Sequence, residues 1–257
     1  MATSRFEEGH VWRVTALTKT EPDGDLLSRL RLVLQVDERL APPEPVPDQD
    51  WVAKVQRDMP AVAAGRYWVY GSHIPLPPRD GRIPIQVDAA SAFGTGHHES
   101  TKGCLIALDR LSRDFAPTRI LDVGTGTGIL AVAAAKTWLA NVVASDNDPK
   151  AVQVAAHVVR QNGVSGSVRC IVAEGLSGRA IAAAAPFDLI VANILAGPLA
   201  ALAPAVWRRA APSARIVLSG ILAMQATQVV AAYRAAGFRR TEILRLGDWV
   251  TIGFRRA

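Results

Sequence analysis

The feature that most constrains this fold is a regular alternation of short apolar runs and helical segments after Arg119. The apolar runs have the composition of buried strands and lie at Ile120–Val123, Val142–Ala144, Val168–Val172, Asp188–Ala192 and Arg215–Leu218. The segments with helical spacing lie at Ile129–Thr137, Pro149–Asn162, Pro198–Ala210 and Met224–Ala236. Strands that alternate with helices in this way predict a parallel sheet with helices on both faces.

The final stretch of the chain departs from that pattern. Glu242–Leu246 and Trp249–Phe254 read as strands, and Gly247-Asp248 between them favours a tight turn. The sequence therefore predicts that the parallel sheet ends in an antiparallel hairpin.

The first 90 residues are less regular and rich in proline, and we expect them to form a small N-terminal α+β domain and a connection. Strand candidates are Val11–Leu17, Arg66–Tyr70 and Ile83–Val87; Leu26–Val36 fits helix or strand, Trp51–Met59 has helical spacing, and Ala41–Pro47 suits a linker. We predict an N-terminal region with its linker at 1–45, a connecting segment at 46–90 and the main domain at 91–257.

Glycines 124, 126 and 128 follow the first strand of the main domain, where a ligand could approach the backbone closely. A dinucleotide loop has the pattern G-x-G-x-x-G/A, but here the third glycine comes one position early and Ile129 takes its place. Asp122 adds a negative charge that disfavours a pyrophosphate and favours a cationic aminoacyl group. The spacing indicates a Rossmann-like class I methyltransferase that uses S-adenosylmethionine; a nicotinamide oxidoreductase is the alternative.

Acidic residues end the next two strands. Asp146 follows the second strand directly, where a carboxylate can accept both ribose hydroxyls, whereas Asp148 precedes Pro149 and looks like a helix N-cap. Glu174 ends the third strand near the expected adenine, although a solvent-exposed loop acid is an equal alternative. We therefore predict that Gly124, Gly126, Asp146 and Glu174 bind the cofactor.

Asn193 ends the fourth strand, where its amide could orient the cofactor or accept a hydrogen bond from a substrate amine. It is our candidate catalytic residue, and we find no dedicated general base. The following Ile-Leu-Ala contains no aromatic ring to stack on a base, which disfavours nucleobase methylation. In Phe93-Gly-Thr-Gly-His97-His98-Glu99, adjacent histidines of a helix would point about 100° apart, so we predict a cofactor-covering loop and no metal site.

Composition gives weaker evidence on the partners and the cellular compartment of the protein. The net charge is +6, and the front section is slightly acidic while the rest is basic; this leaves RNA nearby possible, but we predict no sequence-specific nucleic-acid binding. Cys104 and Cys170 lack metal-ligand spacing and suit buried thiols in a reducing compartment. With no signal-peptide pattern and no apolar span, we expect a cytoplasmic protein without membrane contact.

Three motifs in this order resemble the PrmA family, the bacterial lysine methyltransferases of ribosomal protein L11. They are Phe93-Gly-Thr-Gly-His97, Asp122-Val-Gly-Thr-Gly-Thr-Gly128 and Asn193-Ile-Leu-Ala-Gly-Pro198, and Leu218-Ser-Gly-Ile-Leu222 follows them. The match covers residues 85–257. The resemblance implies that Thr101, Gly124, Asp146 and Asn193 hold S-adenosylmethionine, and that lysine nitrogens of L11, with its α-amino group as a further acceptor, receive the methyl groups.

The resemblance also implies a substrate-recognition domain ahead of the catalytic one, but the section before Ala41 is shorter than that domain usually is. The alternatives are a methyltransferase for another protein or a small-molecule amine, and a catalytically silent ribosome-assembly factor. Transfer of label from the cofactor to L11 would separate all of these.

Overall fold

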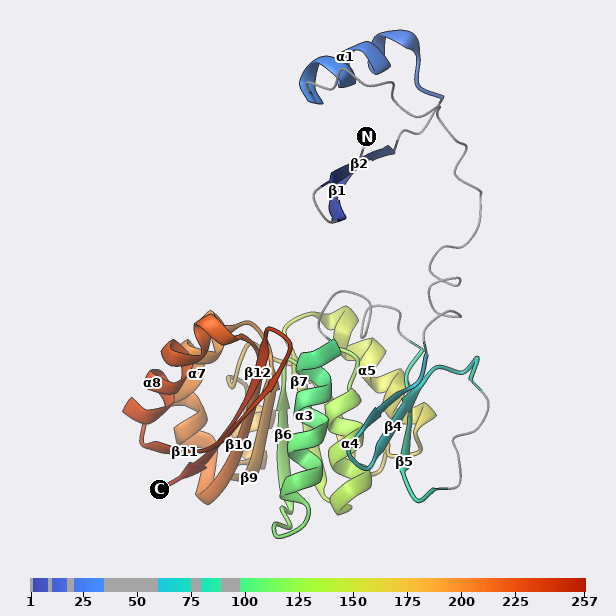
Figure 1. Cartoon of the computed structure of the whole chain (residues 1–257). Helices are drawn as coiled ribbons and strands as arrows, with labels where there is room; N and C mark the ends of the chain where they lie inside the picture. Colours follow the sequence, from blue (N-terminus) through green and yellow to red (C-terminus); the bar gives the residue numbers. More distant parts are fainter. Residues whose placement is uncertain (1, 9–10, 18–20, 35–59, 75–79, 89–97) are drawn as a thin grey trace. The chain divides into compact units, whose positions relative to one another are not determined.

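The apolar runs that follow Arg119 form five adjacent strands of one seven-stranded sheet in the computed structural model (Figure 1). The structure describes residues 2–8, 11–17, 21–34, 60–74, 80–88 and 98–257. The chain divides into two units, Met1–Asp50 and Trp51–Ala257.

The first unit contains a two-stranded sheet and a helix. Strands β1 (Ala2–Glu8) and β2 (Val11–Leu17) pair antiparallel, and helix α1 spans Gly24–Leu34. The strand predicted at Val11–Leu17 is confirmed. The ambiguous segment at Leu26–Val36 is helical as far as Leu34, and its last two residues lie outside the described residues. The predicted linker at Ala41–Pro47 and helix at Trp51–Met59 lie outside the described residues.

The large sheet has the strand order β11-β12-β10-β9-β6-β7-β8. Its parallel strands are β6 (Arg119–Val123), β7 (Asn141–Asp146), β8 (Val168–Val172), β9 (Phe187–Asn193) and β10 (Ala210–Leu222). Strands β11 (Phe238–Leu246) and β12 (Trp249–Arg256) form the predicted hairpin, and β12 pairs antiparallel with both β10 and β11. The fold class predicted from the sequence is confirmed.

Helices cover both faces of this sheet, and two apolar cores lie beneath them. One core packs against α3 (His98–Leu111), α4 (Ile129–Trp138) and α5 (Pro149–Gln161). The other packs against α7 (Ala196–Arg209) and α8 (Ala226–Ala235), with the short α6 (Arg179–Ala184) and the 3₁₀ turn η1 (Ala223–Gln225) beside it. Alternate strand residues enter the two cores, as the pleat requires.

A second, three-stranded sheet belongs to the same unit as the large sheet. It consists of β3 (Val62–Ala64), β4 (Tyr67–Tyr70) and β5 (Ile83–Gln86), in the order β3-β4-β5. Tyr67, Val69 and Ile85 lie in the core shared with α3 and α4. The segment predicted as a connection therefore forms a sheet of its own that packs on the main domain.

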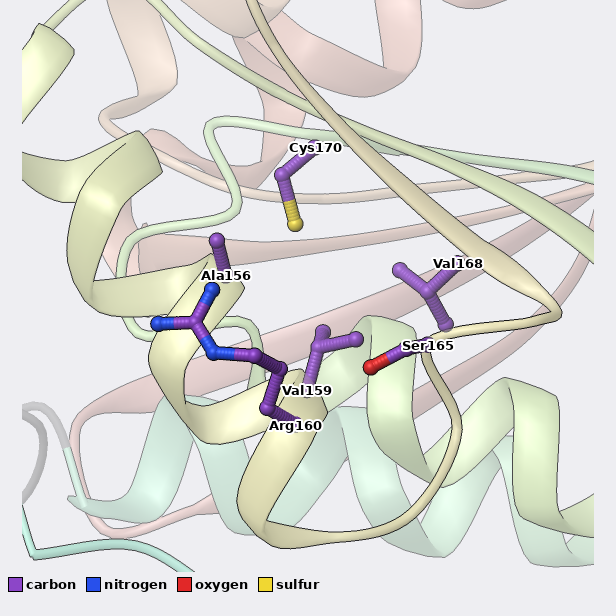
Figure 2. A pocket seen from close by; sticks show the side chains of 6 residues that line it. All are labelled: Ala156, Val159, Arg160, Ser165, Val168 and Cys170. Carbon is purple, nitrogen blue, oxygen red and sulfur yellow. The ribbon is translucent and has the colours of Figure 1, made fainter.

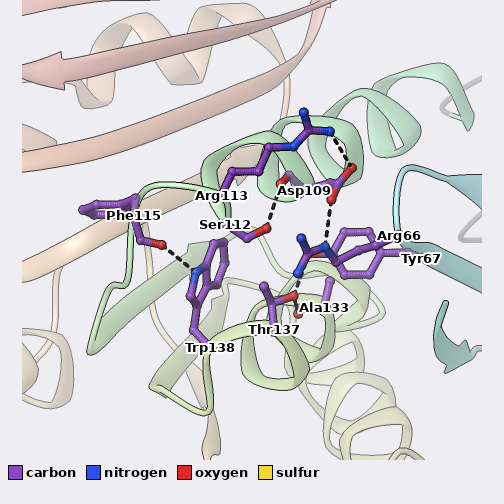
Figure 3. A network of polar contacts seen from close by, with 9 residues as sticks. All are labelled: Arg66, Tyr67, Asp109, Ser112, Arg113, Phe115, Ala133, Thr137 and Trp138. Atoms are coloured by element: carbon purple, nitrogen blue, oxygen red, sulfur yellow. Dashed lines mark hydrogen bonds and ion pairs between the residues drawn. The ribbon is translucent and has the colours of Figure 1, made fainter. Parts of the chain in front are cut away.

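A polar network joins this small sheet to the helices (Figure 3). The Arg66 Nε lies 2.7 Å from Oδ1 of Asp109 on α3, and the Tyr67 hydroxyl lies 2.7 Å from the Thr137 hydroxyl on α4. Burial raises the pKa of Tyr67 to about 12, so the phenol stays neutral at physiological pH. The network fixes β4 against the two helices that lead into and out of β6.

No helix among the described residues is both long and apolar enough to cross a membrane.

Candidate functional site at the carboxyl edge of the sheet

The strand order reverses next to β6, and open α/β sheets have their ligand crevice at the carboxyl edge beside such a reversal. From β6 the chain moves outward through β7 to β8, and it then returns to the other side of β6 as β9 and β10. Ligands of open α/β sheets bind where the order reverses in this way. The loops after β6, β7 and β9 carry most of the predicted site residues to this edge.

The glycine loop after β6 turns sharply beneath the neighbouring strands. Gly124 has a φ of +67°, and a Cβ there would collide with the Ile194 side chain. Gly126 has a φ of +54°, but a Cβ at this position would meet no atom within 4 Å. The loop therefore needs glycine at 124 for packing, while at Gly126 its backbone borders open space.

Asp122 lies under this loop, in a buried position. Its Oδ2 accepts hydrogen bonds from the Thr125 hydroxyl at 2.6 Å and from the Ala131 amide at 3.1 Å, whereas Oδ1 has no partner among the described residues. Burial raises the pKa of Asp122 to about 6. The carboxylate is 1% exposed, so it supports the loop from below and does not present itself to a ligand.

Asp146 ends β7 and faces the glycine loop. Its Oδ2 accepts a hydrogen bond from the Gly126 amide at 2.9 Å, and its Oδ1 accepts one from the Asp148 amide at 3.1 Å. Asp148 accepts from the Lys150 amide and is the N-cap of α5, with Pro149 in the first turn. The structure confirms the predicted N-cap role of Asp148.

Asn193 and Thr101 meet across the crevice, although 92 residues separate them in the chain. The Asn193 Nδ2 donates to the Thr101 Oγ1 at 3.1 Å. Thr101 is 5% exposed and belongs to the first turn of α3, while Asn193 ends β9 and is half-buried. The amide nitrogen of Asn193 only donates and is directed to Thr101, and the amide oxygen is the one acceptor atom of this side chain.

Two further positions, Gly220 and Ser219, were not singled out from the sequence as site residues. Gly220 has a φ of +79°, and a Cβ there would collide with the carbonyl oxygen of Ile194. Ser219 pairs in register with Asn193, and its hydroxyl lies 2.9 Å from that of Thr251 on β12. The Ser-Gly pair that follows the fifth apolar run was the available signal, since glycine often marks a close backbone approach.

Glu174 lies beyond the end of β8 with an exposed side chain. Its backbone carbonyl accepts hydrogen bonds from the Ser177 amide and hydroxyl, and these bonds shape the loop. The structure gives its carboxylate no contact with the other predicted site residues. Both the adenine-binding interpretation and the loop-acid interpretation remain predictions.

The histidine segment falls mostly outside the described residues. Residues 93–97 of the predicted loop lie outside the described residues, whereas His98 and Glu99 belong to the first turn of α3, where Glu99 is exposed. Among the residues that the structure describes, no three His, Cys, Asp or Glu side chains form a group that could hold a metal ion.

A surface hollow of about 250 Å³ lies away from the carboxyl-edge residues, between α5 and β8 (Figure 2). Arg160, Ser165 and Cys170 contribute its polar and sulfur atoms, and no predicted site residue lines it. Cys104 is buried as expected, but Cys170 is only half-buried, because β8 is the edge strand of the sheet.

The residues at the crevice fit an amino-acid nucleoside such as S-adenosylmethionine. The open space at Gly126 is a cradle that a Cβ would fill, and the Asp146 carboxylate lies at its border. Each oxygen of Asp146 accepts one backbone hydrogen bond, and a carboxylate oxygen can accept two. Asp146 can therefore still accept hydrogen bonds from a pair of ribose hydroxyls.

Comparisons with known proteins identify relatives of this chain. A family model described as ribosomal protein L11 methyltransferase (PrmA) matches residues 4–257. A protein with that description from Rhizobium etli strain CIAT 652 is 41% identical over 253 residues, which cover 97% of this chain and 86% of the relative. One from Bradyrhizobium diazoefficiens is 47% identical over 208 residues, which cover 81% of this chain and 70% of the relative. The crystal structure of the ribosomal protein L11 methylase from Lactobacillus delbrueckii subsp. bulgaricus superimposes with a TM-score of 0.66 at 25% identity, covering 76% of this chain and 97% of that one.

Proposed function

Since the chain belongs to the ribosomal protein L11 methyltransferase (PrmA) family, we propose that it transfers methyl groups from S-adenosylmethionine to lysine nitrogens of ribosomal protein L11. The α-amino nitrogen of the same substrate is a further acceptor of the same chemistry. Ribosomal proteins are made in the cytoplasm, and the two free cysteines suit its reducing conditions, so we place the reaction there.

The observation that supports this proposal most directly is the contact between Asn193 and Thr101. It holds a side-chain amide at the end of β9, beside the glycine loop, and leaves the amide oxygen as an acceptor. An acceptor that is fixed in this way suits an amine substrate, which has hydrogens to donate.

In this proposal the cofactor lies along the carboxyl edge from the glycine loop to β8. The backbone at Gly124 and Gly126 borders it, Asp146 accepts from its ribose hydroxyls, Thr101 and Asn193 bind its amino-acid end, and Glu174 lies on the adenine side. When it is bound, the cofactor supplies a methyl group that its sulfonium has already activated. The protein then mainly has to orient the acceptor.

A lysine amine must be neutral to accept a methyl group, but its pKa in water is about 10.4. The Asn193 oxygen can hold the amine by one N–H and direct its lone pair toward the methyl carbon. We assign no residue as a general base. The amine therefore loses its proton to solvent before docking, or through desolvation beside a cationic cofactor.

The test is incubation of the purified protein with labelled S-adenosylmethionine and total ribosomal proteins, followed by identification of the labelled protein. We expect label on L11. Label on another ribosomal protein would contradict L11 as the substrate but would still agree with a protein methyltransferase. Cofactor binding without any methyl transfer would support a catalytically silent factor.

The same assay tests Asn193. We expect Asn193→Ala to lower the rate of methyl transfer about 100-fold, since one well-placed hydrogen bond to a reacting group contributes about 2–3 kcal/mol. Asn141→Ala is the control, because Asn141 is exposed at the opposite end of β7. An unchanged rate and unchanged cofactor affinity in Asn193→Ala would remove this residue from the site.

A further inference from the structure

Three arginines form a row across the hairpin edge of the large sheet. Arg215 on β10 is the register partner of Arg255 on β12, and Arg255 is also the register partner of Arg239 on β11. Residues directly opposite one another in antiparallel strands point to the same face of the sheet. We call Arg215, Arg255 and Arg239 the arginine row.

The arginine row is accessible. Arg239 and Arg255 are exposed, and Arg215 is half-exposed, with its guanidinium 5.7 Å from the ring centroid of Phe115. The described residues provide none of the three with an ion-pair partner: the acid further along β11, Glu242, is already paired with Arg110 at 3.1 Å.

The surroundings are also basic. The sequence contains no Asp or Glu from Leu189 to Thr241, which includes six arginines, or from Trp249 to Ala257, which includes two. The acids that adjoin these stretches are Asp188, Glu242 and Asp248. A large positive field on one edge of a domain attracts polyanions.

This arrangement is unfavourable for stability in itself. Like charges directly opposite one another in a sheet repel. Strands are separated by about 4.8 Å, so the Cα atoms of the three arginines lie along a line of roughly 10 Å, and none of the three has an ion-pair partner among the described residues. Each guanidinium can bind a phosphate through two N–H groups, so the row provides three neighbouring donors for a polyanion.

We propose that the arginine row binds the phosphate backbone of RNA without reading its sequence. The inference rests on the proposed function, because a ribosomal protein meets ribosomal RNA and an enzyme that modifies it works close to that polyanion. The row lies roughly 13 Å along β10 from Ser219, four residues away, so RNA bound there leaves the carboxyl edge open.

The test measures binding of a fluorescein-labelled RNA hairpin of mixed sequence by anisotropy over a range of salt concentrations. Arg239→Gln/Arg255→Gln removes two charges from the row. Arg169→Gln/Arg179→Gln removes the same charge from exposed positions on β8 and α6, at the other end of the sheet. We expect the row variant to bind about tenfold more weakly at low salt, with a salt slope smaller by about 2, and the control to bind like the wild type.

Folding is checked by the midpoint of thermal unfolding, which should not fall in the row variant because a repulsion is removed. Absence of RNA binding at low salt, or an equal loss in both variants, would overturn the proposal. Tighter binding of phosphatidylglycerol vesicles through the same two arginines would also overturn it in favour of a membrane surface. Because this readout needs no methyl transfer, a failed RNA-binding test and a failed L11 assay are distinguishable results.

Discussion

Asp146 and Asp148 have different roles at the carboxyl edge of the sheet. Asp146 faces the glycine loop and Asp148 caps α5. We predict that Asp146→Ala weakens S-adenosylmethionine binding about 100-fold, because two hydrogen bonds to a carboxylate contribute about 3 kcal/mol together. Asp148→Ala is the matched control: it should cost about 1 kcal/mol of stability and leave the affinity within about twofold. Calorimetric titration and denaturant unfolding measure the two effects; the opposite pattern would reverse the assignment.

Asp122 links the glycine loop to pH. Its pKa rises to about 6 in the folded protein from 3.8, chiefly through burial, so the folded state binds a proton more tightly than the unfolded state. The stability that this group contributes is therefore complete below pH 3.8 and is lost as the pH rises through 6.

Asp122→Asn removes this dependence. We predict that the free energy of unfolding of the variant, relative to the wild type, rises by up to about 3 kcal/mol between pH 4 and pH 7. Urea denaturation across this range measures the difference. A constant difference would mean that Asp122 titrates alike in the folded and unfolded states.

At the scale of elements, the small sheet depends on its ion pair with α3. The Arg66–Asp109 pair is partly shielded, with side-chain exposures of 38% and 15%, whereas the Arg245–Asp248 pair is exposed at 64% and 90%. We expect Arg66→Leu to destabilise the protein by about 1–2 kcal/mol and Arg245→Leu by less than about 0.5 kcal/mol. Faster amide hydrogen exchange in β4 and β5 would accompany the first change. An equal loss of stability in the two variants would show that the Arg66–Asp109 pair stabilises the protein no more than an exposed ion pair does.

The elements that the sequence predicts well are those with a strong local signal. Strands β6, β7 and β9 each contain a short apolar run, and α5 begins with a capping aspartate followed by proline. Strand β3 has three residues, and α6 has six residues with no side-chain cap, so neither had such a signal. Strand β10 begins at Ala210, ahead of the apolar run predicted at Arg215–Leu218. Pro212 and Ser213 interrupt the apolar pattern between these points, Ser213 has a φ of +64°, and the pairing of β10 with β9 shifts register there.

The site residues also divide into those with a signal along the chain and those that only the packed structure brings together. Glycine spacing and acids at strand ends can be read along the chain, so Gly126 and Asp146 were both predicted and lie together. The hydrogen bond between Thr101 and Asn193 joins a helix to a strand 92 residues later, and only the packed structure brings them together. That Asp122 lies beneath the loop also depends on packing, since a sequence does not show which way a buried carboxylate turns.

At the scale of the whole molecule, the chain contains two units with separate predicted roles. The family match begins at residue 4 and so includes most of the Met1–Asp50 unit. We assign substrate recognition to that unit and cofactor binding to Trp51–Ala257. We predict that a chain of residues 51–257 binds S-adenosylmethionine with unchanged affinity but methylates L11 at least about tenfold more slowly. Loss of cofactor binding would contradict the division of roles.

Methylation of L11 by this protein is tested most directly with purified components. Purified L11 is incubated with isotope-labelled S-adenosylmethionine and either the wild-type protein or Asn193→Ala, and the labelled residues are located by peptide mass spectrometry. We expect label on lysine side chains of L11 with the wild type and a loss of about 100-fold in rate with the variant. L11 that stays unlabelled while the wild-type protein binds S-adenosylmethionine would contradict it.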